Sequence, residues 1–249
     1  MADLAGAANA ASRVFTFEDA GTRPGACLTL SIPEALGQVS PTVNPSPDYL
    51  VPPQVLDPRY GMYVWPCAVV LAQYLWSRKE QLPGLGVLEL GAGVSLPGVV
   101  AARCGAKVIL SDRAEAPSCL DNCRRSCRAN GVQDAVVLGL TWGDVSPDVL
   151  LLPKLDLILG SDVFYDPEDF EDVFFTVAFL LRKNPEAQFW TTYQERSADW
   201  SVAALLRRWN LRCVAVGLDS FGADKPDLAG SNLPGRHRVL MAVITLGGD

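Results

Sequence analysis

Short apolar runs alternate with amphipathic stretches along most of the chain after residue 61. Short apolar runs bounded by Gly, Pro or polar residues are typical of buried strands, whereas apolar residues three or four positions apart are typical of helices. The runs predict strands at residues 86–90, 107–111, 135–138, 155–160, 188–192, 212–216 and 239–246. The amphipathic stretches predict helices at residues 66–76, 97–104, 116–129, 167–182 and 198–209.

This order of elements predicts the fold class. Strands that alternate with helices form a mostly parallel sheet that is covered by helices on both faces. The last two strands are joined by a long loop rather than by a helix, which indicates an antiparallel pair. We therefore expect an α/β, Rossmann-like, doubly wound seven-stranded sheet that is mostly parallel and has an antiparallel last strand.

The N-terminal part of the chain has a different pattern. Residues 1–12 are small and rich in Ala, and predict a disordered start. Runs at residues 14–18 and 27–32, separated by Gly and Pro, predict a β-hairpin, and the aperiodic residues 37–58 predict an irregular loop. The chain therefore divides into an N-terminal extension, residues 1–58, and a larger domain, residues 59–249.

Charge and composition narrow the classes of partner. The chain has 28 Asp and Glu against 21 Lys and Arg, a net charge of −7, and a pI of about 4.8. Phosphate binding needs clustered Lys and Arg, so the acidic balance argues against direct contact with nucleic acid and suits a basic protein better. No apolar run reaches the roughly 18–20 residues of a membrane span, and no signal-peptide pattern opens the chain. We therefore expect a soluble intracellular protein.

The seven Cys do not have the paired short spacings of a zinc ribbon. Cys119, Cys123 and Cys127 repeat every fourth residue, which places them on one helix face. One helix rarely surrounds a tetrahedral metal ion, and the only His, His237, is remote in sequence. We therefore expect no metal, and interpret the thiols as buried, reduced and inert, which suits a cytosolic or nuclear compartment.

The most informative motif follows the first strand of the larger domain. Glu89 is followed by Gly91 and Gly93, and a helix begins a few residues later. Glycines in such a turn let the backbone approach a ligand, and the helix N-terminus offers free N–H groups. A dinucleotide fingerprint needs a third Gly where Leu96 stands. The acidic variant is instead typical of S-adenosylmethionine (SAM)-dependent methyltransferases, in which the carboxylate can help to accommodate the amino group of SAM.

Asp112 ends the second strand of this domain, 21 residues after Gly91. An acid at this point of a nucleotide-binding fold accepts hydrogen bonds from both ribose hydroxyls. The glycine turn and Asp112, in this order on a strand–helix–strand unit, therefore predict a site for SAM. A nicotinamide-dependent oxidoreductase on a related fold is the alternative enzyme.

From about residue 62 to residue 246 the sequence resembles the seven-stranded class I methyltransferases of the protein-lysine family 16 group. The resemblance is carried by Val64-Trp65-Pro66, Leu71-Ala72, Glu89-Leu90-Gly91-Ala92-Gly93, Asp112, Thr141-Trp142-Gly143 and Ser161-Asp162-Val163-Phe164-Tyr165. Residues 63–71, 197–200 and 233–237 are similar to one subgroup of this family, for which arginine is the expected target. The loop at residues 37–53 does not belong to the family pattern.

The resemblance also implies which residues bind the cofactor. Trp65 and Trp142 would contact the adenosyl group, and the glycine turn would contact the methionine part. Asp112 would bind the ribose, and Ser161 would lie along the cofactor. The complete set of cofactor-binding residues is Trp65, Glu89, Gly91, Ala92, Gly93, Asp112, Trp142 and Ser161.

Asp162 and Tyr165 are the candidate catalytic residues. Asp162 stands at the carboxyl end of the fourth strand, where ligands bind in open α/β sheets. Its carboxylate can hold an arginine guanidinium by paired hydrogen bonds or orient a lysine amine. Tyr165 would line the channel or accept a hydrogen bond from the nitrogen. Tyr193 and Arg196 would line the same mouth, and we interpret His237 as a surface residue.

Six of the eleven residues from Asp162 to Asp172 are acidic and none is basic. Favourable charge in the first turns of the following helix explains some of them, but not Asp162 or Asp166, which precede that helix. Steering of a basic peptide towards the site is the alternative explanation.

We predict a SAM-dependent protein N-methyltransferase that modifies an arginine of a histone or another basic protein. The family as a whole implies lysine, and the double-Glu loop of standard arginine methyltransferases is not apparent, so lysine is the alternative target. A non-catalytic SAM-binding interaction module is a further alternative. The resemblance also implies chaperone contacts and a monomer located in the nucleus and cytoplasm, with no direct nucleic-acid or membrane partner.

Overall fold

The computed structural model describes residues 10–19, 26–35, 60–194, 202–225, 227–231 and 239–248. Several predictions made from the sequence lie outside these residues: the state of residues 1–9, the loop at 37–58, the start of the helix at 198–209, and the side chains of Arg196 and His237.

The sheet of the larger domain has seven strands in the order β5-β4-β3-β6-β7-β9-β8. Five neighbouring strands are parallel, and β9 is antiparallel to both β7 and β8. The strands are β3 (Gly86–Leu90), β4 (Lys107–Asp112), β5 (Val136–Gly139), β6 (Leu157–Ser161), β7 (Gln188–Gln194), β8 (Leu211–Val216) and β9 (Val239–Leu246). The predicted Rossmann-like fold with an antiparallel last strand is confirmed.

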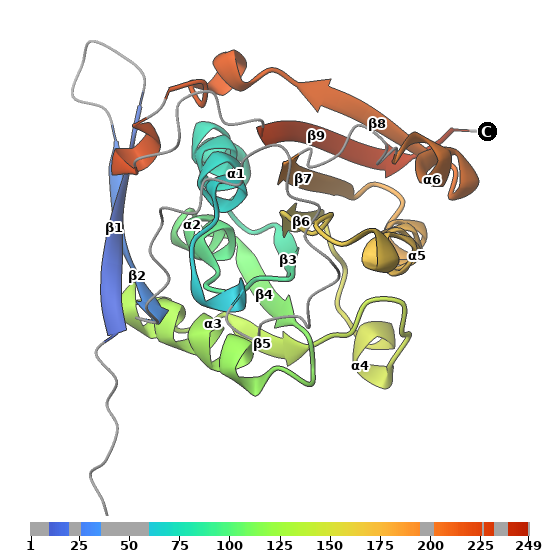
Figure 1. The fold of residues 1–249 in the computed structure, drawn as a ribbon, viewed down its shortest axis with the longest axis horizontal. Coiled ribbons are helices and arrows are strands. Elements are labelled where there is room, and N and C mark those ends of the chain that lie inside the picture. Colours follow the sequence, from blue (N-terminus) through green and yellow to red (C-terminus); the bar gives the residue numbers. More distant parts are fainter. Residues whose placement is uncertain are drawn as a thin grey trace, which may run out of the picture.

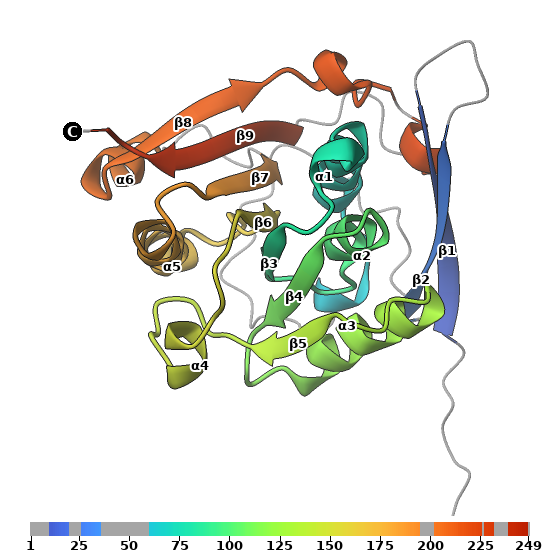
Figure 2. The same cartoon turned by 180° about the vertical axis from the view of Figure 1, so that it is seen from behind.

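Helices cover both faces of this sheet (Figures 1 and 2). On one face lie α1 (Pro66–Ser77), α2 (Leu96–Arg103) and α3 (Pro117–Ala129), and on the other lie α5 (Phe170–Lys183) and α6 (Ala203–Arg208). Alternate side chains of the central strands enter different cores: Val87 of β3 packs towards α1 and α2, whereas its neighbour Leu88 packs towards α5. This alternation explains why the central strands read as continuous apolar runs.

The remaining elements are short. They are α4 (Pro147–Leu150) and the 3₁₀ turns η1 (Tyr60–Met62), η2 (Lys79–Gln81), η3 (Pro167–Asp169), η4 (Leu218–Phe221) and η5 (Leu228–Gly230). The sequence pattern did not predict α4. The helix predicted from residue 167 begins as the 3₁₀ turn η3 and becomes α-helical at Phe170.

The predicted N-terminal hairpin is present as β1 (Ala10–Glu18) and β2 (Cys27–Ala35), paired antiparallel. The prediction of disorder up to residue 12 was wrong for residues 10–12, which lie in β1 and pair with the end of β2. The inner face of the hairpin is apolar, and it belongs to the same core as α1 and α2. Its buried side chains are Phe15, Phe17, Leu28, Leu30 and Ile32.

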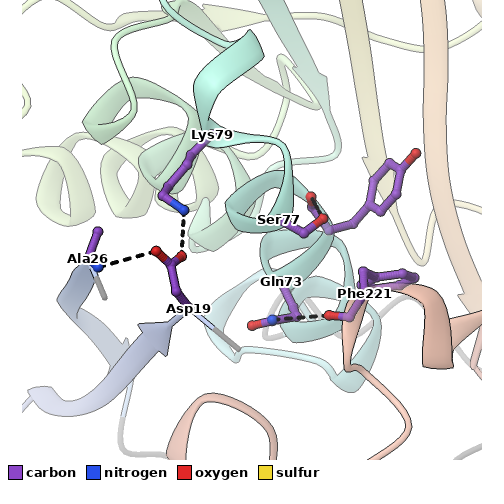
Figure 3. A network of polar contacts seen from close by, with 7 residues as sticks. Asp19, Ala26, Gln73, Ser77, Lys79 and Phe221 are labelled. Carbon is purple, nitrogen blue, oxygen red and sulfur yellow. Dashed lines mark hydrogen bonds and ion pairs between the residues drawn. The ribbon is translucent and has the colours of Figure 1, made fainter. Parts of the chain in front are cut away.

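Polar contacts attach the middle of β2 and the turn end of the hairpin to the larger domain. Asn130, which follows α3, donates to the carbonyl of Ser31 and accepts from its amide, each at 2.8 Å. At the turn end, the carboxylate of Asp19 contacts Lys79 and the amide of Ala26 (Figure 3). The hairpin therefore packs firmly on the sheet domain, and the predicted division at residue 58 stays a prediction.

No helix in the described part of the chain is long and apolar enough to cross a membrane. Likewise, the described residues contain no group of three His, Cys, Asp or Glu that could hold a metal ion.

Candidate functional site

The carboxyl ends of the five parallel strands meet at one edge of the sheet. Parallel strands end side by side, so the segments that follow them line a common surface. The residues that follow or end four of these strands are Gly91, Asp112, Trp142 and Asp162. These four sequence-predicted residues therefore converge on this edge.

The turn after β3 depends on glycine at two positions. Gly91 and Gly93 have φ angles of 60° and 52°, which lie in the left-handed region that favours glycine. A Cβ on Gly91 would lie 3.0 Å from Cζ2 of Trp142, and one on Gly93 would lie 3.3 Å from the carbonyl oxygen of Gly61. Backbone conformation and space therefore both require glycine, and they leave bare backbone facing the edge.

Asp112 connects this turn to the end of β4. Its Oδ2 accepts a hydrogen bond from the amide of Gly93 at 2.8 Å, and its Oδ1 accepts from the amide of Arg113 at 2.8 Å. Burial raises the pKa of Asp112, while these two hydrogen bonds act in the opposite direction. Each oxygen can accept further hydrogen bonds, so the carboxylate is oriented and suited to a pair of hydroxyls.

Glu89 lies behind the glycine turn rather than on the open edge. Its side chain is fully buried, and its Oε2 accepts from the amide of Gly98 in α2 at 2.9 Å. Oε1 has no hydrogen-bond partner among the described residues. Burial raises the pKa of Glu89 to about 8, with the charge of Asp112 adding to the effect, so the carboxyl is mainly protonated at neutral pH.

Residues 61–67, which lead into α1 and include its first two residues, cross the carboxyl edge of the sheet; we call them the crossing segment. At one end, the side-chain amide of Asn122 donates to the carbonyl of Gly61 at 3.3 Å and contacts the sulfur of Met62 at 2.7 Å. At the other end, the hydroxyl of Thr192 in β7 donates to the carbonyl of Cys67 at 2.8 Å. The crossing segment thus runs from the glycine turn to the end of β7.

Trp65 lies in the crossing segment and keeps 39% of its surface exposed. A large aromatic residue with this exposure is available to a ligand, in contrast to Tyr74 and Trp76 of α1, which are buried. Trp65 and the glycine turn therefore border the same edge, and contact of Trp65 with the cofactor stays a prediction.

Trp142 follows β5 and lies against the glycine turn, as its distance from Gly91 shows. The next residue, Gly143, donates from its amide to the hydroxyl of Thr176 in α5 at 2.9 Å, which fixes the loop. The ring of Tyr165 is 6.4 Å from that of Trp142, tilted by 58°. Two aromatic rings from different loops are therefore brought together beside Gly91.

Asp162 has an unusual backbone conformation. Its φ is 57°, in the left-handed region, although it is not glycine. Its amide donates to the carbonyl of Thr192 at 2.7 Å, and the preceding Ser161 pairs with Thr192 across β6 and β7. Asp tolerates this conformation better than most residues, and such conformations gather at functional sites.

Tyr165 is held as a neutral phenol. Burial raises its pKa to about 12, and the nearby charge of Asp169 adds to this effect. The adjacent Phe164 fixes the loop, since its ring packs against those of Phe170, Phe174 and Tyr193. Tyr165 can therefore donate or accept a hydrogen bond but cannot act as an anionic base at neutral pH.

The structure corrects part of the interpretation of the acidic run. Asp166 is not left without a structural role: its carboxylate caps η3 by accepting from the amide of Glu168 at 3.0 Å. Glu171 pairs with Arg208 at 3.1 Å. Burial raises the pKa of Asp169, and neighbouring acids, Asp166 first, add to this. Local folding thus explains more of these acids than the sequence indicated.

The three Cys on α3 are buried, as predicted. Burial raises the pKa of Cys119 and Cys127 to about 11 and raises that of Cys123 further, so all three are protonated thiols. Cys27 and Cys213, in contrast, are exposed.

Sequence reasoning missed two residues that shape the site. Asn122 lies on the buried face of α3 between Cys119 and Cys123, and a polar residue on an apolar helix face is a signal that could have revealed it. Glu34 of β2 accepts from the amide of Val64 at 2.8 Å, and no local pattern in the sequence indicates this contact.

The sequence of the chain matches the family model described as lysine methyltransferase over residues 53–202. It is 66% identical over 194 residues to the histone-arginine methyltransferase METTL23 of Xenopus laevis, with 78% of this chain and 83% of the relative covered. The histone-arginine methyltransferase METTL23 of Homo sapiens is 60% identical over 188 residues, which cover 76% of this chain and 99% of the relative. The protein N-lysine methyltransferase METTL21A of Mus musculus is 39% identical over 122 residues, which cover 49% of this chain and 56% of the relative.

Solved structures of low sequence identity share the fold. The glycopeptide N-methyltransferase MtfA in complex with SAM superposes with a TM-score of 0.51 at 13% identity, covering 72% of this chain and 94% of that one. The mitomycin 7-O-methyltransferase MmcR has a TM-score of 0.51 at 14% identity, and the match covers 73% of this chain and 53% of that one.

Proposed function

Because the chain belongs to the lysine methyltransferase family, whose members transfer the methyl group of SAM, we propose that it methylates an arginine side chain of a histone or another basic protein. The observation that carries this proposal is the identity of 60–66% to relatives named histone-arginine methyltransferases, over about three quarters of the chain. Because the chain belongs to a methyltransferase family, the two alternatives, a nicotinamide-dependent oxidoreductase and a non-catalytic SAM-binding module, are set aside.

The described residues fit SAM at the carboxyl edge. Because Gly91 and Gly93 carry no side chain, the methionine part could approach the backbone of the glycine turn closely. Asp112, oriented by its two amide contacts, would accept the ribose hydroxyls. Trp65, Trp142 and Ser161 would border the adenosyl group and the rest of the cofactor.

Glu89 has a different part in this proposal. Because its carboxyl is buried against the N-terminus of α2, it would hold α2 and the glycine turn in place. It would not contact the amino group of SAM directly. It therefore supports the methionine subsite rather than lining its surface.

SAM supplies a methyl group that is activated by its sulfonium. The protein must bring a nitrogen lone pair in line with that methyl group and exclude water. Asp162 would hold the guanidinium by hydrogen bonds to its N–H groups, so that the reacting nitrogen keeps its orientation and the proton lost on methylation passes to the carboxylate or to water. Tyr165, as a neutral phenol next to Trp142, would form one wall of the channel.

Lysine is the second candidate target. It is favoured by the description of the family and by the 39% identity to METTL21A, which is named a protein N-lysine methyltransferase. The same carboxylate would then orient an amine instead of a guanidinium.

A basic substrate would enter beside the acidic residues of η3 and the start of α5. Asp169 and Asp172 lie near Trp142 and Tyr165, as the effect of Asp169 on the pKa of Tyr165 and the contact of Asp172 with Gly143 indicate. Activity on histones would place the protein in the nucleus. A monomeric state, chaperone contacts and a cytoplasmic pool remain predictions.

The test is incubation of the full chain with isotope-labelled SAM and purified histones, followed by mass spectrometry of the labelled peptides. We expect the label on arginine, and no label with Asp162→Asn. Label on lysine alone would overturn the arginine assignment, and absence of label on any protein substrate with a chain that binds SAM would overturn the choice of a basic protein.

A further inference from the structure

The hairpin β1–β2 lies outside the residues that match the family model, yet it contacts the segment that carries Trp65. Hydrogen bonds attach the crossing segment to several elements of the chain. Asn122 of α3 holds one end and Thr192 of β7 holds the other, and both belong to the matched region. Between these two ends, Glu34 of the hairpin adds a further attachment, because its Oε1 accepts from the amide of Val64.

The amide of Val64 needs this acceptor. Val64 is 7% exposed and precedes the N-cap residue of α1, so its N–H points into the protein without an acceptor inside the helix. The Glu34 side chain is itself only 12% exposed, which shields the hydrogen bond from water. Hydrogen bonds to an ionised acceptor are stronger than those between neutral groups. Removing Glu34 would leave a buried donor unsatisfied one residue before Trp65.

The hairpin presents Glu34 from a rigid support. Phe15, Phe17 and Ile32 are fully buried in the core shared with α1, and Ser31 is bonded to Asn130 in both directions. Arg13 on the neighbouring strand contacts the same Oε1 at 3.5 Å, with 41% of its side chain exposed. The longer distance and greater exposure make Arg13 the lesser partner.

We propose that Glu34 is a positioning residue for the cofactor site: by holding the amide of Val64, the hairpin fixes the crossing segment, and with it Trp65, in the conformation that receives SAM. This inference rests on the cofactor site proposed above. A segment that is already ordered binds a ligand with a smaller loss of conformational freedom than one that must be ordered on binding. Loss of Glu34 therefore weakens the affinity for the cofactor and leaves the affinity for the protein substrate unchanged.

The chain offers a matched control at the other end of the hairpin. Asp19, like Glu34, accepts one backbone amide, that of Ala26, and pairs with one basic side chain, that of Lys79 (Figure 3). Lys79 follows the C-terminal end of α1 and Val64 precedes its N-terminal end, and a helix of 12 residues spans about 18 Å. Asp19→Ala therefore removes the same kinds of contact far from Trp65.

The experiment measures the dissociation constant of S-adenosylhomocysteine (SAH) by calorimetry for the full chain, together with the melting temperature without ligand and the KM for a histone substrate. For Glu34→Ala we expect about a tenfold rise in the dissociation constant, equivalent to about 1.4 kcal/mol, and an unchanged KM for the histone. For Asp19→Ala we expect a dissociation constant within about twofold of the wild type, the size of effect expected for loss of an exposed ion pair.

Two conservative variants separate the position of the acceptor from its charge. Glu34→Gln keeps an oxygen at the same place and should restore most of the affinity, whereas Glu34→Asp keeps the charge but withdraws the oxygen by one carbon and should not. Glu34→Asp also provides the test should Glu34→Ala fail to fold.

Equal dissociation constants for Glu34→Ala and the wild type would overturn the inference, as would an equal loss in Asp19→Ala or a lower melting temperature without any change in SAH binding. A wild-type chain that binds no SAH would instead overturn the proposed cofactor site itself.

Discussion

The amide of Gly93 donates a 2.8 Å hydrogen bond to Oδ2 of Asp112, so one side chain joins the turn after β3 to the end of β4. The two residues are 19 positions apart in sequence: Gly93 lies in the turn after β3, and Asp112 ends the neighbouring parallel strand β4. The contact orients the carboxylate and at the same time supports a glycine turn in the left-handed conformation. Any change at Asp112 should therefore affect binding of the cofactor more than stability of the fold.

For Asp112→Asn we expect the dissociation constant of SAH to rise by about 100-fold, which corresponds to loss of hydrogen bonds worth about 3 kcal/mol. The amide oxygen can still accept from Gly93, but the NH₂ group that replaces Oδ1 cannot accept from a ribose hydroxyl or from the amide of Arg113. Calorimetry measures the change. Asp121→Asn on the exposed side of α3 is the control, and a dissociation constant within threefold of the wild type for Asp112→Asn would contradict the assignment.

Glu89 predicts a pH dependence of stability. Its pKa is about 8 in the folded protein and 4.5 as an ordinary glutamate, so the folded state retains a proton that the unfolded state has lost between these values. The free energy of unfolding contributed by Glu89 is therefore full below pH 4.5, falls as the pH rises to about 8, and is then constant. The total fall is at most about 5 kcal/mol.

Glu89→Gln removes this titration while keeping an acceptor for the amide of Gly98. Urea unfolding of both proteins at pH 5, 7 and 9 measures the difference between them. We expect the variant to gain stability relative to the wild type as the pH rises. Parallel pH curves for the two proteins would show that Glu89 does not titrate in this range.

Much of the fold was accessible from the sequence because its signals are local. The run that forms β3, the glycines after it and Asp112 at the end of β4 all lie in one continuous strand–helix–strand unit. Asp162 and Trp142 could be placed at the same edge because strand ends meet there in any parallel sheet. The predicted site residues thus follow from strand order and from the resemblance.

The contacts that hold the site were less accessible. Glu34 reaches Val64 across 30 residues and Asn130 reaches Ser31 across 99, and neither pairing leaves a periodic pattern in the sequence. The burial of Glu89 was also missed, because a Glu two residues before a glycine turn can face either the ligand or the helix behind it. Only the packing of α2 against β3 decides between the two.

The effect of Asp162 on catalysis should be separable from its effect on the stability of the fold. Asp162→Asn keeps a residue type that tolerates the left-handed conformation, whereas Asp162→Ala adds a backbone cost of about 1 kcal/mol. We expect both variants to bind SAH like the wild type and to lose at least about 100-fold in kcat, with only Asp162→Ala less stable. Single-turnover assays and thermal unfolding measure these effects. Wild-type kcat in Asp162→Asn would exclude the residue from catalysis.

Tyr165 should contribute its ring rather than an ionised oxygen. With a pKa of about 12 the phenol stays protonated through the range of a practical assay. We therefore expect Tyr165→Phe to retain kcat within about tenfold and to have a pH–rate profile parallel to that of the wild type between pH 7 and 9.5, while Tyr165→Ala loses more through the missing wall. A limb of the profile that disappears in Tyr165→Phe would instead identify the phenol as a titrating base.

The acidic residues between Asp162 and Asp172 lead to a prediction about substrate affinity. The local contacts of each acid decide which one it concerns. Asp166 caps η3 and Glu171 pairs with Arg208, so their charges already have structural roles. The Oδ2 atom of Asp169, in contrast, is buried without a hydrogen-bond partner among the described residues, and this side chain lies close enough to Tyr165 to affect its pKa.

For Asp169→Asn we therefore expect the KM for a basic histone peptide to rise about threefold to tenfold, with kcat nearly unchanged and with a weaker dependence of KM on salt, because screening acts on the lost attraction. Steady-state kinetics at two ionic strengths measure both effects. Glu171→Gln is the matched control, since its charge is compensated by Arg208 and its loss should change KM less than twofold, as for an exposed ion pair. An equal rise of KM in both variants would mean that the net charge of the protein, rather than the place of Asp169 beside the channel, attracts the substrate.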